Sequence, residues 1–231
     1  MDDTPRVRAP DHTRSKSALF NRLNQIAYKF SANNRERKWR RFAETFVADP
    51  SWLAIDVGFS PGGSVVSDNL FEKRYPFTSQ ITALTIAEIG SAHERYPDIN
   101  IVKYDGTTMP FDDRHFDVLW SNAVVEHVGG EDRQVDFLRE IDRVAQRHFV
   151  TTPNRWFPFE VHTKLPILHY LPKALFDPIA RRLGFGWATG RYMNLLSKRQ
   201  FKRRLRLAGI RDVRIISNRV CGIPVDFVAV W

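Results

Sequence analysis

The sequence predicts an open α/β fold, in which a mostly parallel sheet is covered by helices on both faces. Short apolar segments alternate along the chain with segments of helical periodicity, as in consecutive β-α-β units. The segment 116–123 is apolar at adjacent positions, which is typical of a strand buried on both faces. A turn rich in small residues follows the apolar segment 52–57, where such folds hold nucleotide-like ligands.

The composition fits one such domain with an elaboration, because the chain has 231 residues. Its single cysteine, Cys221, excludes an intrachain disulfide framework and a cysteine-rich zinc site. The N-terminus lacks the apolar core of a signal peptide, and no apolar run is long enough to span a bilayer. We therefore expect a cytoplasmic protein. No HxxxH or HxH pair occurs, so we expect no metal.

The formal net charge of +9 is concentrated in the segments 33–42 and 197–207. Both fall in expected helices, where a run of charges usually forms a solvated face. The charge also suits an anionic membrane surface or an acidic substrate. No aromatic–basic motif of RNA-binding domains and no helix-turn-helix accompanies it, so nucleic acid is not the expected partner.

The elements follow in order along the chain. Apolar residues at helical spacing predict one helix from Ser17 to about Phe30 and a second around 39–47. Strands are expected at 52–58, 81–86, 99–105, 116–123, 148–154, 211–220 and 224–231. Between them, helices are expected from Gly62 to about 72–76, at 87–96, at 132–145 and at 197–208, where Gly209 is the stop signal.

The last two expected strands have no helix between them, which predicts an antiparallel edge on a seven-stranded sheet. The domain organisation follows from the same pattern. Residues 49–231 are expected to form the α/β domain, with a helical insert at about 156–190. Residues 1–48 are expected to form a basic helical extension.

Small, polar or acidic residues follow five of the strands in turn. They occupy positions 56–63, 85–88, 105–106, 122–127 and 152–155. In an open α/β sheet the ligand lies at the carboxyl ends of the strands, near the point where the strand order reverses. The pattern therefore predicts a ligand-binding edge.

Three segments carry a family resemblance. AIDVGFSPGG (54–63) resembles the first motif, D-x-G-x-G-x-G, of class I S-adenosylmethionine (SAM)-dependent methyltransferases. YDGTTMPFDDRHFDVLWSNAVVEHV (104–128) resembles the later motifs of that family, in the subgroup often labelled type 11. TTPNRWFPFEVHTKLPILHYLP (151–172) is similar to a segment of some bacterial members. Over residues 50–230 or so, the resemblance implies the Rossmann-like class I methyltransferase fold, with SAM as cofactor.

The resemblance also implies roles at the first strand. Gly58 and Gly62 would let the backbone approach the methionine part of SAM, since a side chain there would intrude. Asp56 would organise the loop or meet the amino group of SAM through water. Ser60 departs from the motif, because it replaces the middle glycine and brings a hydroxyl to the cofactor channel.

The later strand ends complete the implied cofactor site. Asp105 would bind the adenine amino group, with Gly106 beside it, and Asn122 would line the methyl-transfer side. The second strand departs from the family, because Thr85 stands where an acidic residue usually holds the ribose hydroxyls. Thr85 can replace part of that interaction, and Glu88 either reaches the ribose or caps the following helix.

Two histidines are candidates for the general base. His127 ends the VVEH segment, and a pKa near neutrality would let it accept a proton from a substrate hydroxyl. The alternative is a structural histidine beneath the sheet. His162, with Glu160, lies on the insert that follows the fifth strand and forms the other candidate pair.

The expected reaction is methylation of a small molecule, a saccharide or a lipid-linked acceptor, on oxygen because two candidate bases are present. The aromatic, proline-rich and basic insert can rest on an anionic membrane surface, peripheral to the inner face, or form an ordinary helical lid. Ser60 and Thr85 motivate a second reading, a non-catalytic binding module that has lost the cofactor. An RNA methyltransferase is a third, based on the positive charge.

Overall fold

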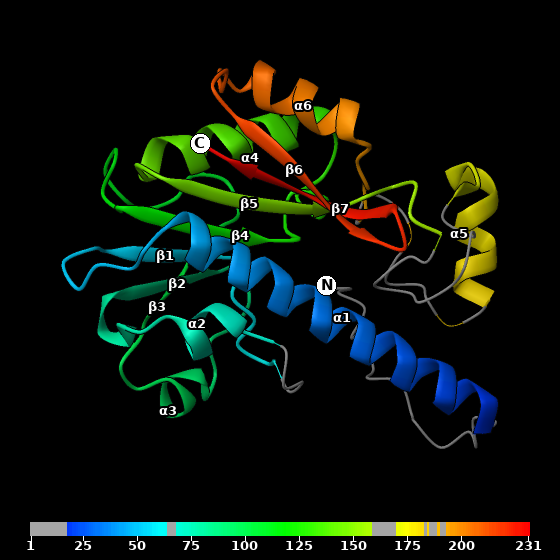
Figure 1. Cartoon of the computed structure of the whole chain (residues 1–231), viewed down its shortest axis with the longest axis horizontal. Helices are drawn as coiled ribbons and strands as arrows, with labels where there is room; N and C mark the ends of the chain where they lie inside the picture. The colour runs from blue at the N-terminus through cyan, green and yellow to red at the C-terminus, as the bar shows by residue number, and fades with distance from the viewer. Residues whose placement is uncertain (1–17, 64–67, 159–169, 183, 185–188, 190–192) are drawn as a thin grey trace, which may run out of the picture.

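A computed structural model describes residues 18–63, 68–158, 170–182, 184, 189 and 193–231, with side chains of the first helix from Ser31 onward. Seven strands form one sheet in the order β3-β2-β1-β4-β5-β7-β6 (Figure 1). The first five strands are parallel, and β7 runs antiparallel to both β5 and β6. This confirms the expected mostly parallel sheet with an antiparallel edge.

The central strands form where β-branched and apolar residues follow one another. The strands β1 (Ala54–Val57), β2 (Ile81–Thr85) and β5 (His148–Pro153) are buried at every position, because both faces of the sheet are covered. They are joined by β3 (Asn100–Lys103), β4 (Val118–Asn122), β6 (Arg214–Val220) and β7 (Ile223–Val230). In register, Asp56 lies between Ala83 of β2 and Trp120 of β4.

Helices cover the two faces of the sheet (Figure 1). On one face, α4 (Glu131–Val144) and α6 (Lys198–Leu207) insert apolar side chains such as Leu138 and Phe201 into a common core. On the other face lie α1 (Ala18–Thr45), α2 (Leu70–Arg74) and α3 (Ala92–Arg95). Phe42 of α1 and Phe71 of α2 pack there against Trp120 and Phe149 of the sheet.

Several expected helices differ in extent. The two N-terminal helices are one continuous α1, since neither glycine nor proline interrupts residues 18–45. The described helix after β1 is only α2, and the helix expected at 87–96 is only α3, bounded by Gly90 in the left-handed region and by Pro97. Within the insert, α5 spans Lys173–Arg182. In the described part of the chain, no helix is both long and apolar enough to cross a membrane.

Candidate active site

The turn after β1 is fixed by its neighbours. Gly58 has φ of 111°, and its N–H and that of Phe59 both donate to the carbonyl of Leu84 on β2 at 3.1 Å. A Cβ on Gly58 would lie 2.3 Å from Cγ2 of Val124, in the segment after β4. Glycine is therefore required here because the β1 and β4 loops interlock. At Gly62, by contrast, a Cβ would meet nothing within 4 Å.

A cavity of about 110 Å³ lies beside this turn, at the carboxyl ends of β1 and β4. Four of the sequence-predicted residues line it together: Asp56, Gly58, Ser60 and Asn122. Arg35 from α1 and Glu72 from α2 line it as well. Ser60 itself is exposed, and its N–H bonds the side chain of Asn69 at 3.2 Å.

Asp56 and Glu72 form an acidic pair in the wall of the cavity. Their residues are 6% and 3% exposed, and the two carboxyl groups lie within hydrogen-bonding reach of each other. No N–H or O–H of the described residues donates to either oxygen of Glu72. Burial, followed by the charge of Glu72, raises the pKa of Asp56 well above its usual value, and burial also raises the pKa of Glu72. Among the described residues, the Glu72 carboxylate thus has no hydrogen-bond donor, and a positively charged amino group would supply one.

Asn122 is held by a second buried cluster. Lys38 of α1 is 4% exposed, and its Nζ donates to Oδ1 of Asn122 at 2.9 Å. The same Nζ lies 3.1 Å from Oδ2 of Asp226 on β7 and 3.4 Å from Oγ1 of Thr151 on β5. The Thr151 hydroxyl also donates to Oδ1 of Asn122 at 2.8 Å. One helix and three strands thus meet at the amide of Asn122.

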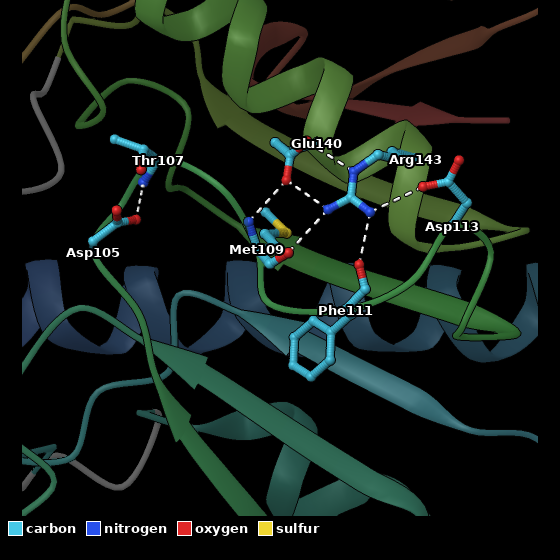
Figure 2. Close-up of polar contacts among 7 residues, drawn as sticks. All are labelled: Asp105, Thr107, Met109, Phe111, Asp113, Glu140 and Arg143. Atoms are coloured by element: carbon cyan, nitrogen blue, oxygen red, sulfur yellow. Dashed lines mark hydrogen bonds and ion pairs between the residues drawn. The ribbon is translucent and has the colours of Figure 1, made fainter.

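The loop after β3 presents Asp105 and Gly106 to solvent. The N–H of Thr107 donates to Oδ1 of Asp105 at 2.8 Å, and these contacts lower the pKa of that carboxyl (Figure 2). Gly106 has φ of 81°, in the left-handed region that glycine favours.

The guanidinium of Arg143, on α4, holds the continuation of this loop (Figure 2). It donates to the carbonyls of Met109 and Phe111 at 2.9 and 2.7 Å and pairs with Asp113 at 3.0 Å. The Glu140 carboxylate bonds the same guanidinium at 2.8 Å and also accepts from the N–H of Met109. Those contacts, first with Glu140, raise the pKa of Arg143 further, so this cation is permanent.

After β2, the next helix begins later than the sequence predicts. The Thr85 side chain is buried, and Oγ1 accepts from the N–H of Ala87 at 3.1 Å within its own turn. Glu88 is exposed and pairs with Lys103 of β3. Because α3 begins only at Ala92, Glu88 does not cap a helix as the alternative interpretation expected.

His127 lies in the segment after β4. Its side chain is about one-fifth exposed, and Nε2 lies 4.0 Å from Oε1 of the buried Glu126. Glu126 in turn accepts from the hydroxyl of Thr152, at the end of β5, at 3.1 Å. His162 and its partner Glu160 lie outside the described residues. Among the described residues, no group of three or more His, Cys, Asp or Glu side chains is arranged as metal ligands.

Sequence reasoning missed Lys38, Arg35 and Glu72. Lys38 and Arg35 belong to the basic segment 33–42, which was read as a solvated face. A signal for Lys38 exists, because it lies four positions before Phe42 and therefore on the apolar face of the helix. Glu72 carries no such signal, since its burial depends on how the short α2 meets β1.

Comparisons with known proteins agree with this architecture. Residues 55–148 match the family model of a methyltransferase domain. No curated protein matches the sequence of the chain.

Solved structures resemble the whole sheet. A putative sarcosine dimethylglycine methyltransferase from Galdieria sulphuraria is 17% identical, with a TM-score of 0.53 over 81% of this chain and 63% of that one. A SAM-dependent methyltransferase from Aquifex aeolicus is 13% identical, with a TM-score of 0.52 over 84% and 87%. Geranyl diphosphate C-methyltransferase from Streptomyces coelicolor A3(2) is 15% identical, with a TM-score of 0.53 over 95% and 84%.

At these identities the structural likeness concerns the fold alone, and this chain spans less than two thirds of the Galdieria protein. The sequence match is independent of that likeness and lies on the strands and loops that carry the cavity. The chain therefore carries a methyltransferase-domain match over residues 55–148, within a seven-stranded sheet whose fold resembles that of solved methyltransferases.

Proposed function

We propose that the protein transfers a methyl group from SAM to an oxygen atom of a small-molecule, saccharide or lipid-linked acceptor. The observation that carries the cofactor part is the cavity at the ends of β1 and β4. The buried acidic pair Asp56 and Glu72 lines this cavity together with Asn122, and the Glu72 oxygens have no donor among the described residues. An α-amino acid carries a cation and an anion close together, so the methionine part of SAM matches this lining.

Each residue has a role in this proposal. Asp56, supported by Glu72, accepts from the ammonium group of the cofactor, and the turn at Gly58 gives close backbone approach. Asp105 accepts from the adenine amino group, with Gly106 beside it. Bound SAM supplies an electrophilic methyl group on a positively charged sulfur. The remaining task of the protein is to align the acceptor and to exclude water.

The second strand end is where the cofactor site departs most from the family. The hydroxyl oxygen of Thr85 accepts a hydrogen bond from the N–H of Ala87. Glu88 forms an ion pair with Lys103. The pair lies on the protein surface, where an ion pair contributes little to stability and its partners separate readily. We therefore keep Glu88 as the group proposed to reach the ribose.

The acceptor side is supported by a second cavity, of about 300 Å³, between α4, α6 and the segment 193–196. Arg155, which follows β5 directly, lines it together with the buried Arg204. Phe176 of α5 and Met193 form an apolar part of the wall of this cavity. Glu131 also lines the cavity and pairs with Arg204 at 2.9 Å, so this mixture of charged and apolar lining suits an amphipathic acceptor better than a nucleic acid, which needs an extended basic surface.

His127 is the proposed base for the hydroxyl proton, and the neighbouring Glu126 would stabilise its protonated form. His162, on the insert, is the alternative. His127→Ala and His162→Ala are to be assayed side by side on the acceptor. A sharp loss in only one variant identifies the base, whereas small equal losses leave positioning as the whole mechanism.

The cofactor assignment is tested by calorimetric titration with SAM and S-adenosylhomocysteine. Asp105→Ala should raise both dissociation constants about ten- to a hundredfold, the effect of losing a hydrogen bond to a charged group. The exposed position of Asp105 predicts an unchanged melting temperature. No binding by the wild-type protein at millimolar SAM would favour the non-catalytic binding module instead.

The acceptor is tested by mass spectrometry of cell extract incubated with protein and SAM, in which a methylated product is heavier by about 14 mass units. Contact with a membrane is tested separately, because α5 exposes Leu175 and Ile179, one turn apart, near two arginines. Binding to phosphatidylglycerol vesicles should fall in the Leu175→Ser/Ile179→Ser variant. Equal binding by the two proteins would exclude α5 as the contact.

A further inference from the structure

The ammonium group of Lys38 is fully engaged by neighbouring side chains. An ammonium group has three protons, and Nζ of Lys38 has three acceptors, on Asn122, Asp226 and Thr151. The carboxylate of Asp226 is bonded on its other side by Nδ2 of Asn218 at 2.7 Å. Since all three protons of Lys38 are engaged inside the protein, its ammonium has none left for a ligand.

The amide of Asn122 is oriented by this cluster. Oδ1 receives two donors, the ammonium of Lys38 at 2.9 Å and the hydroxyl of Thr151 at 2.8 Å. Lys38 can act only as a donor toward it because an ammonium has no acceptor, and the Thr151 hydroxyl, which accepts from Lys38, can donate its own hydrogen to the same oxygen. A flipped amide would place NH₂ against an ammonium. The geometry therefore fixes which end of Asn122 is the donor end.

The NH₂ group of Asn122 has no hydrogen-bond partner among the described residues, although the residue lines the cavity beside Gly58. Its two hydrogens are directed away from the buried cluster. A neutral donor held rigidly in this way recognises an oxygen lone pair and disfavours another donor.

We propose that Lys38 is a positioning residue that holds Asn122 so that its NH₂ group donates to an oxygen atom of the bound ligand. The inference rests on the proposed function, because it places that ligand at the same cavity. The oxygen belongs either to the carboxylate of the cofactor or to the acceptor. Helix α1, which contributes Lys38, lies outside the residues that match the methyltransferase-domain model.

Asn122→Asp is the sharpest variant. It preserves shape and the acceptor for Lys38 and Thr151, but it replaces the donor facing the cavity with a second acceptor. The probes are S-adenosylhomocysteine, which carries the carboxylate, and 5′-methylthioadenosine, which lacks the whole amino-acid part. If the oxygen is the cofactor's, affinity for S-adenosylhomocysteine falls about ten- to a hundredfold and affinity for 5′-methylthioadenosine does not change.

If the oxygen is the acceptor's, both probes bind Asn122→Asp as they bind the wild-type protein, but the methylated product in extract is lost. Unchanged binding together with unchanged product would overturn the inference. Failure of the wild-type protein to bind S-adenosylhomocysteine would overturn the proposed function and the inference with it. If the wild-type protein binds S-adenosylhomocysteine but Asn122→Asp changes neither binding nor product, only the inference is overturned and the proposed function stands.

The role of Lys38 needs its own variant, because removing it alone leaves Asp226 charged and buried. Lys38→Met/Asp226→Asn removes both charges together. Whichever of the two results Asn122→Asp gives, weaker S-adenosylhomocysteine binding or loss of the methylated product, this double variant should give the same one. Arg40→Met is the matched control, because it removes a charge from the same helix at a side chain that is 71% exposed. A double variant that behaves like the control would overturn the positioning role.

Discussion

Two buried charged clusters meet the same edge of the sheet, and they differ in whether their charges are compensated. In the first, Lys38 and Asp226 are 3.1 Å apart, and each charge has hydrogen-bond partners on neighbouring elements. In the second, Asp56 and Glu72 are like charges, and none of the described residues supplies Glu72 with a donor.

Because of this difference, the first cluster has a structural role, whereas the second is the one proposed to bind a ligand. A buried ion pair whose hydrogen bonds are complete orders the elements that contribute to it, although its net stabilisation is small. Two buried carboxyl groups close together disfavour their charged forms, and a cation bound beside them would stabilise those forms. The sheet edge therefore contains one cluster whose hydrogen bonds hold its geometry and one that, in the proposed function, accepts the ammonium group of the cofactor.

The largest expected effect comes from breaking the complete cluster. Lys38→Met should lower the free energy of unfolding by about 3–5 kcal/mol, because Asp226 keeps a buried charge without its partner. Urea denaturation measures it. Lys38→Met/Asp226→Asn should lose clearly less than the single variant. If the double variant loses as much or more, the clusters do not differ in compensation.

His148 adds a third case to the comparison, because it is a buried group that stays uncharged. Burial lowers the pKa of His148 from 6.5 to about 4, so the folded protein binds this proton less readily than the unfolded chain does. The stabilisation is present above pH 6.5 and is lost as the pH falls toward 4, by about 3 kcal/mol. His148→Gln should remove that part of the pH dependence in urea denaturation. Parallel pH profiles for variant and wild type would contradict it.

Relieving the incomplete cluster should have the opposite sign. Glu72→Gln replaces one acid with an amide that can donate to Asp56, and should stabilise the ligand-free protein by about 1 kcal/mol at pH 7. Raised carboxyl pKa values mean that the wild type loses stability relative to this variant as the pH rises above about 4. Unfolding at pH 5 and pH 8 tests this, and a gap that does not widen would refute it.

The smallest effect is expected at the solvent-accessible rim. Arg143→Lys keeps the charge but loses the fork that bonds the carbonyls of Met109 and Phe111. We expect about 1 kcal/mol or less in stability and a roughly threefold weaker affinity for S-adenosylhomocysteine, since the loop carries Asp105. Arg139→Lys, on the same helix, is the control. Equal affinities in the two variants would show that the loop does not depend on Arg143.

Most of the fold could be predicted from the sequence, because strand and helix periodicities are local. All seven strands were expected within a few residues, and so was the antiparallel edge. The helices were less predictable at their ends. Continuity of α1 depends on packing over the sheet, and the shortness of α3 depends on the turn around Gly90.

The candidate site was predictable where one strand end supplies the residue. Asp56, Gly58 and Asn122 were named from the sequence and do line one cavity. Lys38 and Glu72 were not, because each becomes relevant only through a tertiary contact with another element. The backbone N–H of Ser60 bonds the side chain of Asn69, and the hydroxyl of Thr85 bonds the N–H of Ala87, which sequence alone does not reveal.

The contact between the first helix and the last strand has a consequence for the order of assembly. Asn34 and Asp226 are 192 positions apart, so their contact closes a loop that includes almost the entire sheet. β7 follows the other described elements in sequence order, and until it is synthesised Lys38 has no counter-ion on that strand. The amide of Asn122 is therefore fully held only after β7 has paired with β5, so the parallel strands β1 to β5 can assemble before the ligand site acquires its final geometry.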